Sequence, residues 1–200
     1  LGAPDLERQL FAMEPARHMH VVDEAYLDDI AIGFGQVIDA KSPYTGGHSD
    51  RVGHIADAVA ARMGLSDDDR RDLRRAAMLH DVGKLGVSSR ILEKPGKLDA
   101  GEWVEMRSHA DLTTDILGRI GVLRDMAMIA GSHHERLDGK GYPLGLDARM
   151  IALETRIITV ADFFDALTAD RPYRAAMDTD KAFAIMAAEV GTALDPHCFA

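Results

Sequence analysis

Cysteine is nearly absent from this sequence. Cys198 is the single cysteine in 200 residues, so no internal disulfide and no cage of several thiolates around a metal can form. Uncharged apolar runs never reach the roughly 18–20 residues of a membrane-spanning helix, and no basic-then-apolar leader opens the chain. These absences predict a cytoplasmic protein without a membrane span. Because the chain opens on Leu1 rather than methionine, we expect it to be part of a longer protein.

Basic residues are also scarce relative to acidic ones. The 23 Lys and Arg face 33 Asp and Glu, which gives a net charge of −10. Non-specific nucleic-acid binders need a basic face to neutralise phosphates, so that function class is excluded. The 46% hydrophobic and 28% charged residues are typical of a globular protein. At roughly 150 residues per domain, this length predicts one domain, or one domain with an appendage.

Strand signals are missing as well, and helical periodicity predicts an all-α protein. Helices are expected within residues 6–40, with a break near Pro15, and over 45–63, 154–169 and 179–190. Further helices should start after Ser66, a good N-cap, and after Asp99, which forms a capping-box pattern with Glu102. Trp103 is expected in the core, with a platform for base stacking as the alternative. Apolar residues follow helical spacing near the N-terminus, in either the domain's own first helix or a dimer-forming linker from an upstream receiver domain: Val22, Ala25, Tyr26, Ile30, Phe34 and Val37.

Nine histidines stand out in this otherwise ordinary composition. His80-Asp81 follows the apolar residues 76–79, so both polar side chains should emerge near the interior, where a metal ion would satisfy them. An adjacent His-Asp pair also occurs at an ordinary capped helix end, and that alternative stays open. Lys84 lies one helical turn after His80 and could aim its ammonium into the same pocket or into solvent.

A second histidine pair and an isolated acid extend the pattern. His133-His134 follows an apolar stretch, and Asp162 stands inside an apolar run where a carboxylate needs a partner. His48 and His109 on their own would be read as structural. Taken together the candidates are too many for one four-coordinate zinc and suit two first-row metals bridged by a carboxylate: His48, His80, Asp81, His109, His133, His134 and Asp162.

Three strings resemble the HD-GYP family, a branch of the HD phosphohydrolases. They are His80-Asp-Val-Gly-Lys84, His133-His-Glu-Arg-Leu-Asp-Gly-Lys-Gly-Tyr-Pro143 and Asp162-Phe-Phe-Asp-Ala-Leu-Thr168. The resemblance extends from about residue 36 to the C-terminus. It implies an all-α, HD-type helical bundle over 36–200, preceded by a helical segment or linker over 1–35 from an upstream receiver or sensor domain.

The resemblance also implies roles for individual residues. Asp81 would bridge two metals, with His48, His80 and Asp162 on one and His109, His133 and His134 on the other. Lys84, Arg171 and Arg174 match positions that contact substrate phosphates, and Tyr142 lies in the loop beside the substrate. Tyr44 stands where some relatives have a third-metal glutamate, which favours two ions. Asp165 would support Lys84 or the residues behind the ligands.

The implied activity is hydrolysis of cyclic-di-GMP to pGpG by a hydroxide bridging two ions of Fe or Mn, with Zn or Ni as alternatives. Onward cleavage of pGpG to GMP stays open. The family's loop around Tyr142 implies docking of a diguanylate cyclase (GGDEF) domain. A homodimer and acceptance of cyclic GMP-AMP stay open. Two other functions remain: a cyclic-di-GMP-responsive docking module, and an HD hydrolase of another nucleotide.

Overall fold

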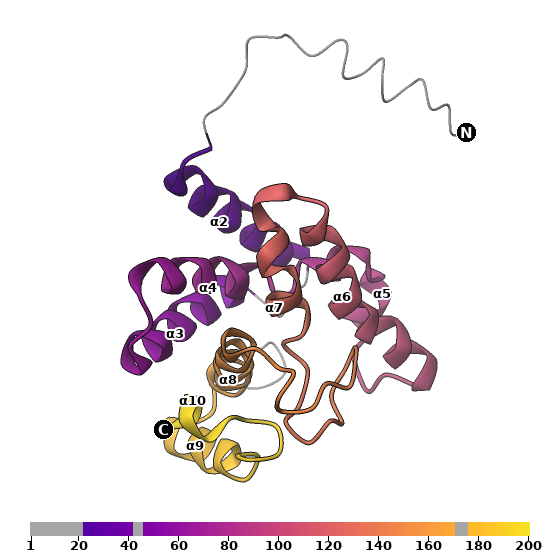
Figure 1. Cartoon of the computed structure of the whole chain (residues 1–200). Helices are drawn as coiled ribbons and strands as arrows, with labels where there is room; N and C mark the ends of the chain where they lie inside the picture. The colour runs from indigo at the N-terminus through magenta and orange to yellow at the C-terminus, as the bar shows by residue number, and fades with distance from the viewer. Residues whose placement is uncertain (1–21, 42–45, 171–175) are drawn as a thin grey trace, which may run out of the picture.

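The computed structural model describes residues 22–41, 46–170 and 176–200. Within these ranges helices dominate, and β pairing is limited to two isolated bridges, Asp138–Asp147 and Val190–Leu194. The all-α prediction is therefore confirmed (Figure 1). In chain order the helices are α2 (Glu24–Lys41), α3 (His48–Met63), α4 (Asp67–Leu79), η1 (Val82–Gly86), α5 (Ser89–Leu92), α6 (Ala100–Gly118), η2 (Gly121–Met126), α7 (Ala127–Gly131), α8 (Leu153–Thr168), α9 (Thr179–Ala187) and α10 (Pro196–Phe199).

Local capping chemistry sets the starts of two central helices, as the sequence predicted. The Ser66 hydroxyl accepts a hydrogen bond from the Asp69 amide at 3.2 Å and opens α4. Asp99 and Glu102 form a reciprocal capping box at the start of α6, with bonds of 3.0 and 2.8 Å. Each cap satisfies amides that the first helical turn leaves without partners.

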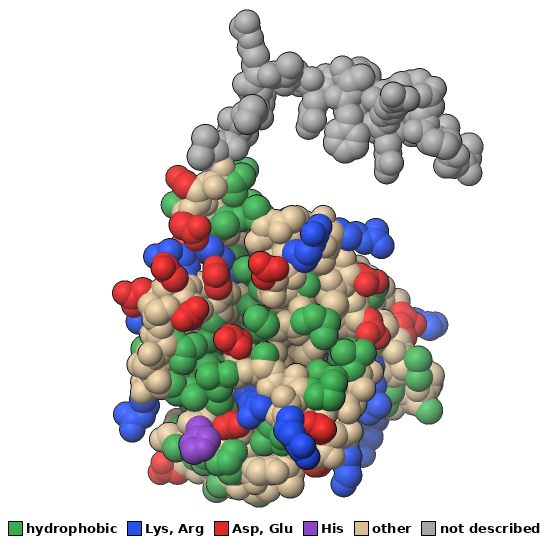
Figure 2. Space-filling view, in the orientation of Figure 1, with side chains coloured by type: hydrophobic (Ala, Val, Ile, Leu, Met, Phe, Trp, Pro, Cys, Tyr) green, Lys and Arg blue, Asp and Glu red, His purple; other side chains and the backbone are tan. Residues whose placement is uncertain are grey.

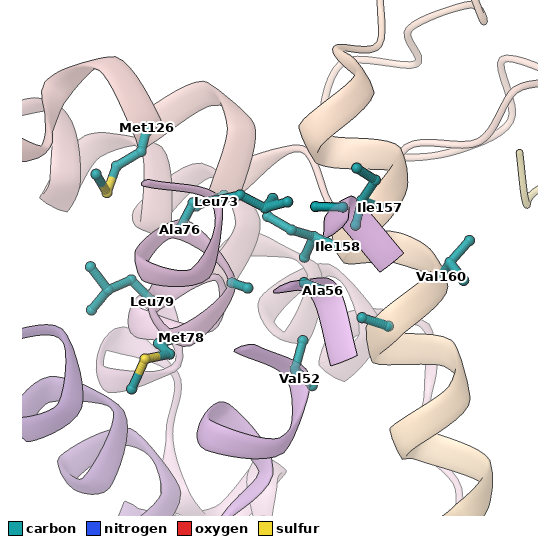
Figure 3. Close-up of a cluster of buried hydrophobic side chains, with 14 of the residues drawn as sticks. Val52, Ala56, Leu73, Ala76, Met78, Leu79, Met126, Ile157, Ile158 and Val160 are labelled. Carbon is teal, nitrogen blue, oxygen red and sulfur yellow. The ribbon is translucent and has the colours of Figure 1, made fainter. Parts of the chain in front are cut away.

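The main core lies where α3, α4 and α8 meet (Figure 3). Alanines at the contacts, including Ala56 on α3 and Ala76 on α4, let the helix backbones approach closely. Leu73 on α4 and Ile157 and Ile158 on α8 then fill the space between them. This packing holds the C-terminal end of α4 against the N-terminal end of α3 and the middle of α8.

The N-terminal apolar stripe does not form a buried face. Tyr26 and Val37 on α2 are 43% and 54% exposed, whereas Ala31 and Gly35 are on the buried side. Small residues face inward because α2 lies close to α3: a Cβ at Gly35 would sit 3.1 Å from that of Ser49. The apolar stripe is therefore exposed while the opposite side of α2 packs on α3 and α4, and both alternatives, the domain's own first helix and a dimer-forming linker, stay predictions.

The expectation that Trp103 lies in the core is wrong. It is 47% exposed on α6, and its neighbour Val104 is 72% exposed. The buried side of α6 is instead lined by small and polar residues, among them His109, Ala110 and Thr113. That side faces η1 and α7, where close contact leaves no space for an indole ring.

The surface carries mixed charge, and on the face drawn in Figure 2 acidic side chains gather mainly at the upper left, with basic and apolar ones spread over the rest. No helix in the described ranges has both the length and the apolarity to cross a bilayer. Helix α2 runs through the predicted boundary at residues 35/36 and contacts α3, α4 and η1. The boundary itself stays a prediction.

Candidate metal centre

Five separate parts of the chain bring polar side chains to one buried point. His48 is the first residue of α3, and His80 caps the C-terminal end of α4. Asp81 directly follows His80 and is the N-cap of η1, so these two form one part of the chain. His109 lies within α6, His133 and His134 follow α7, and Asp162 lies within α8. The structure thus brings together all seven residues selected from the sequence as metal ligands.

Asp81 lies at the centre of this cluster, and its two oxygens face different imidazoles. Its Oδ2 is 3.4 Å from Nε2 of His80 and 3.7 Å from Nε2 of His48. Its Oδ1 is 3.5 Å from Nε2 of His109 and 3.8 Å from Nε2 of His133. A carboxylate placed in this way can serve two cations at once, one on each oxygen.

The ligand atoms also group into sets of a size that suits one ion. His48 Nε2 lies 3.3 Å from His80 Nε2 and 3.5 Å from Asp162 Oδ1. Three sets have all their ligand atoms within 4.8 Å of one another: His48, His80 and Asp162; His109, His133 and His134; and His80, Asp81 and His133. The first two sets are those the family resemblance implied, and the third joins them through Asp81.

Hydrogen bonds behind the cluster orient four of the imidazoles. Each Nδ1 lies within hydrogen-bond distance of an oxygen: His48 with Asp165 Oδ2 at 2.7 Å, His80 with Ala77 O at 2.6 Å, His109 with Met106 O at 2.6 Å and His133 with Ala130 O at 2.7 Å. Because a carbonyl or carboxylate oxygen only accepts, each Nδ1 carries the proton. In the neutral ring the Nε2 lone pair is then directed at the cluster, as metal ligation requires.

Three atoms of the cluster lack partners although they are buried. Asp81 Oδ1, His109 Nε2 and His133 Nε2 have no hydrogen-bond partner among the described residues. An unpartnered buried polar atom costs about 1–3 kcal/mol, and a cation placed among these three would satisfy them all. The donor set therefore fits divalent transition metals, which accept imidazole and carboxylate ligands.

The protonation states suit the same chemistry. Burial lowers the pKa of His80 to about 4 and that of His133 to about 3, so both rings are neutral at pH 7. Burial also places the pKa of His134 well below its usual value. Burial would raise the pKa of Asp81, but the Lys84 ammonium and the surrounding imidazoles outweigh it and hold that pKa well below its usual range. Asp81 is accordingly ionised at pH 7.

His48 differs from the other rings. Burial acts to lower its pKa, but the hydrogen bond to Asp165 and the charges of Asp162 and Asp81 together raise it. Asp165 also accepts hydrogen bonds from Arg51, including one at 3.1 Å. Asp165 therefore supports His48, itself a proposed ligand, rather than Lys84. Lys84 instead contacts Asp81 Oδ2 directly.

The loop after His134 closes one side of the cluster. The Tyr142 ring lies 4.7 Å from that of His134, centroid to centroid, and Tyr142 precedes a cis proline. Glu135 is buried and accepts hydrogen bonds from three loop amides, those of Leu144, Gly145 and Leu146, at 2.6–3.1 Å. The sequence analysis missed Glu135, which fixes the loop rather than facing the ions.

Two motif glycines allow the contacts that assemble the site. A Cβ at Gly83 would lie 1.9 Å from the carbonyl oxygen of His109, so only glycine lets η1 rest on α6. A Cβ at Gly141 would lie 2.4 Å from the Arg136 amide, so only glycine lets the loop fold back beside His134. Both contacts bring motif residues that are distant in sequence into one site.

Some predicted site residues lie elsewhere or outside the description. His54 is exposed on α3, as expected from its position six residues after His48. Arg171, Arg174 and Tyr44 lie outside the described residues, so their expected roles stay predictions. The roles of the seven clustered residues as ligands also stay predictions, now with a geometry that suits them.

Comparison with known proteins decides the family. A model of the HD domain family matches residues 34–198. The chain belongs to the HD domain family. This HD domain is 53% identical over 200 residues to the 3′3′-cGAMP-specific phosphodiesterase 3 of Vibrio cholerae, covering all of this chain and 44% of that protein. It is 37% identical over 198 residues to the cyclic di-GMP phosphodiesterase response regulator RpfG of Xanthomonas campestris, covering 98% of this chain and 51% of RpfG.

A search of solved structures finds a similar phosphodiesterase. The HD domain aligns with the crystal structure of the cyclic GMP-AMP-specific phosphodiesterase V-cGAP3 of V. cholerae at a TM-score of 0.58 and 49% identity, covering 98% of this chain and 45% of that one. The HD-GYP resemblance read from the motifs is confirmed. The HD domain spans about half the length of the curated relatives it matches.

Proposed function

We propose that this HD domain hydrolyses 3′,3′-cyclic dinucleotides using two divalent cations held by the His/Asp cluster. The observation that carries the proposal is the position of Asp81. Its two oxygens face separate groups of imidazoles, and Asp81 Oδ1, His109 Nε2 and His133 Nε2 are buried without a hydrogen-bond partner among the described residues. The phosphodiesterase names of the relatives support the substrate class.

The first proposed ion is held by His48, His80 and Asp162 and the second by His109, His133 and His134, with Asp81 shared. Nitrogen and oxygen ligands without a thiolate suit Fe or Mn, with Zn or Ni as alternatives. Two such cations would neutralise a phosphodiester and lower the pKa of a water molecule that attacks it.

The protein's own residues perform the remaining tasks. Lys84, beside Asp81, places a positive charge where a non-bridging phosphate oxygen would bind and keeps the Asp81 carboxylate ionised. Asp165 holds His48 in position. Tyr142 borders the site on the loop side. Arg171 and Arg174 are proposed as further phosphate contacts.

Two cyclic dinucleotides are candidate substrates. Cyclic-di-GMP, cleaved to pGpG with further cleavage to GMP left open, is the substrate expected from the motifs and matches the activity named for RpfG. The relative with 53% identity is named for 3′3′-cGAMP, which favours that nucleotide as the second candidate. Assays of both nucleotides under the same conditions separate the two.

The test uses protein purified without oxygen and loaded with Fe or Mn. We expect about two ions per chain by elemental analysis and linear products from at least one cyclic dinucleotide by chromatography. Asp81→Asn should reduce turnover at least about 100-fold and lower the metal content. His54→Ala, on the exposed side of α3, is the matched control and should leave both unchanged. Metal-loaded protein that cleaves neither nucleotide would refute the proposal.

A docking function is the second candidate. The loop that Glu135 fixes presents Leu144, which is 56% exposed, at the surface. Such a loop suits a protein partner, and a diguanylate cyclase (GGDEF) domain is the one proposed. Leu144→Asp should abolish capture of that domain in a pull-down while His80→Ala leaves it intact. A nucleotide panel tests the third alternative, an HD hydrolase with another substrate.

A further inference from the structure

A stack of three side chains lies on the rim of the cluster. The Arg107 guanidinium carbon is 5.7 Å from the centre of the Trp103 ring and 5.1 Å from the centre of the Tyr142 ring. Trp103 and Arg107 are four residues apart on α6 and therefore share one face of the helix. Tyr142 reaches this face from the loop that follows His134.

The stack leads outward from the proposed reaction centre. Tyr142 lies 4.7 Å from His134 and 6.4 Å from His109, ring centre to ring centre. Arg107 follows Tyr142, and Trp103 follows Arg107 at the solvent side. A nucleotide whose phosphate occupies the cluster could therefore place a base beside these three side chains.

The outer two members of the stack are available to a ligand. Trp103 is half-exposed, and no ion pair of Arg107 with a carboxylate exists within the described ranges. The apolar face of the exposed indole is in contact with water, so a ligand that covers it removes apolar surface from solvent. The Arg107 guanidinium, held between two rings, keeps its N–H donors at its edge. Flat aromatic faces and arginine planes are the surfaces on which nucleobases stack in proteins that bind single-stranded nucleic acids.

We propose that Trp103 and Arg107 form a subsite for a purine base of the substrate. The base stacks on the Trp103 ring, and the edge of Arg107 supplies hydrogen-bond donors beside it. This inference rests on the proposed function, because it assumes that a cyclic dinucleotide phosphate occupies the neighbouring cluster. Stacking tolerates any base, so this subsite sets affinity for purines and does not choose between cyclic-di-GMP and 3′3′-cGAMP.

Fluorescence tests the subsite directly because Trp103 is the single tryptophan of the chain. Titration with cyclic-di-GMP, 3′3′-cGAMP or GMP should quench its emission to saturation, whereas ribose 5-phosphate, which has no base, should not. Arg107→Met should weaken the affinity in this titration. The readout needs no catalysis, so it separates the subsite from the proposed hydrolysis.

Kinetics supply the second measurement. Trp103→Ala and Arg107→Met should raise KM for cyclic dinucleotides by about 5- to 100-fold, with kcat and metal content little changed. Hydrolysis of bis(p-nitrophenyl) phosphate, which carries no purine, should be unaffected. Val104→Ala, an exposed neighbour on α6, is the matched control.

The fluorescence and hydrolysis measurements together separate the subsite from the proposed function. Saturable quenching without hydrolysis would support the subsite and refute the proposed function. Hydrolysis with unquenched Trp103 and unchanged KM in both variants would refute the subsite and keep the function. Absence of both hydrolysis and quenching would refute both proposals.

Discussion

Each oriented imidazole of the cluster depends on the oxygen behind it, and for His48 that oxygen belongs to a side chain. Asp165→Asn should lower metal affinity and turnover by about 10- to 100-fold, because the ring loses a charged acceptor that fixes its orientation. Metal content after dialysis and kcat/KM measure the effect. Asp115→Asn, exposed on α6, is the control; if the two variants behave alike, Asp165 does not position His48.

Cys198 should be chemically inert in the folded protein. Burial, together with the nearby Asp195, raises the pKa of its thiol to about 12, so almost none of it is thiolate at pH 8. Since the thiolate is the reactive form, iodoacetamide should modify Cys198 far more slowly in the native protein than in urea. Mass spectrometry over time measures both rates. Equal rates would show that the thiol is accessible.

The sequence predicted the clustered residues but not what supports them. Histidines and acids inside apolar runs are conspicuous, because each needs a partner once buried. Their orienting acceptors are mostly backbone carbonyls, such as those of Ala77 and Met106, and every residue has a carbonyl. Glu135 was missed for a related reason: its partners are backbone amides of a loop, which no side-chain pattern marks.

Among the contacts between helices, that of η1 with α6 sets the distance from Asp81 to His109. Gly83→Ala would place a methyl group 1.9 Å from a backbone oxygen, so η1 must move away from α6. We expect a loss of roughly 1–3 kcal/mol in stability or more, together with reduced metal binding. Chemical denaturation and elemental analysis measure these. Gly118→Ala, at the open end of α6, meets nothing within 4 Å and should cost no stability.

The loop beside Tyr142 depends on a single carboxylate. Glu135→Gln keeps the size of the side chain but removes its charge. It also removes one of the two oxygens that accept hydrogen bonds from three loop amides. Amide hydrogen exchange at residues 144–146 should accelerate, while exchange in the α3–α4–α8 core stays unchanged. Exchange that is the same as in wild type would mean that other contacts hold the loop.

Helix ends were predicted more accurately than helix faces. Ser66 and Asp99 act on amides within their own first turn, so a short stretch of sequence contains the information. The buried face of α2 instead depends on how closely α3 and α4 approach, which favours Ala31 and Gly35 over the larger Tyr26. Such contacts join distant parts of the chain, so the hydrophobic periodicity within one helix does not predict them.

For the molecule as a whole, the proposed ions connect α3, α4, η1, α6, α7 and α8. Metal that binds only the folded state adds about 2.7 kcal/mol at a hundred times its Kd, roughly 5–10 °C in melting temperature for this size of domain. Treatment with a chelator should therefore lower the melting temperature, and added Mn should restore it. Asp81→Asn is the control, since its melting temperature should respond little to either. An unchanged wild-type melting temperature would contradict binding at the cluster.

The order of the ligands along the chain has a consequence for biosynthesis. His48 lies near the start of the described domain and Asp162 in its last long helix. A chain still emerging from the ribosome therefore holds the early histidines long before the final carboxylate, and on the proposed ligand set it cannot complete the site of the first ion until Asp162 has been made. Newly made protein would gain its activity only after translation has passed α8, so a prematurely terminated product would be unable to degrade a signalling nucleotide.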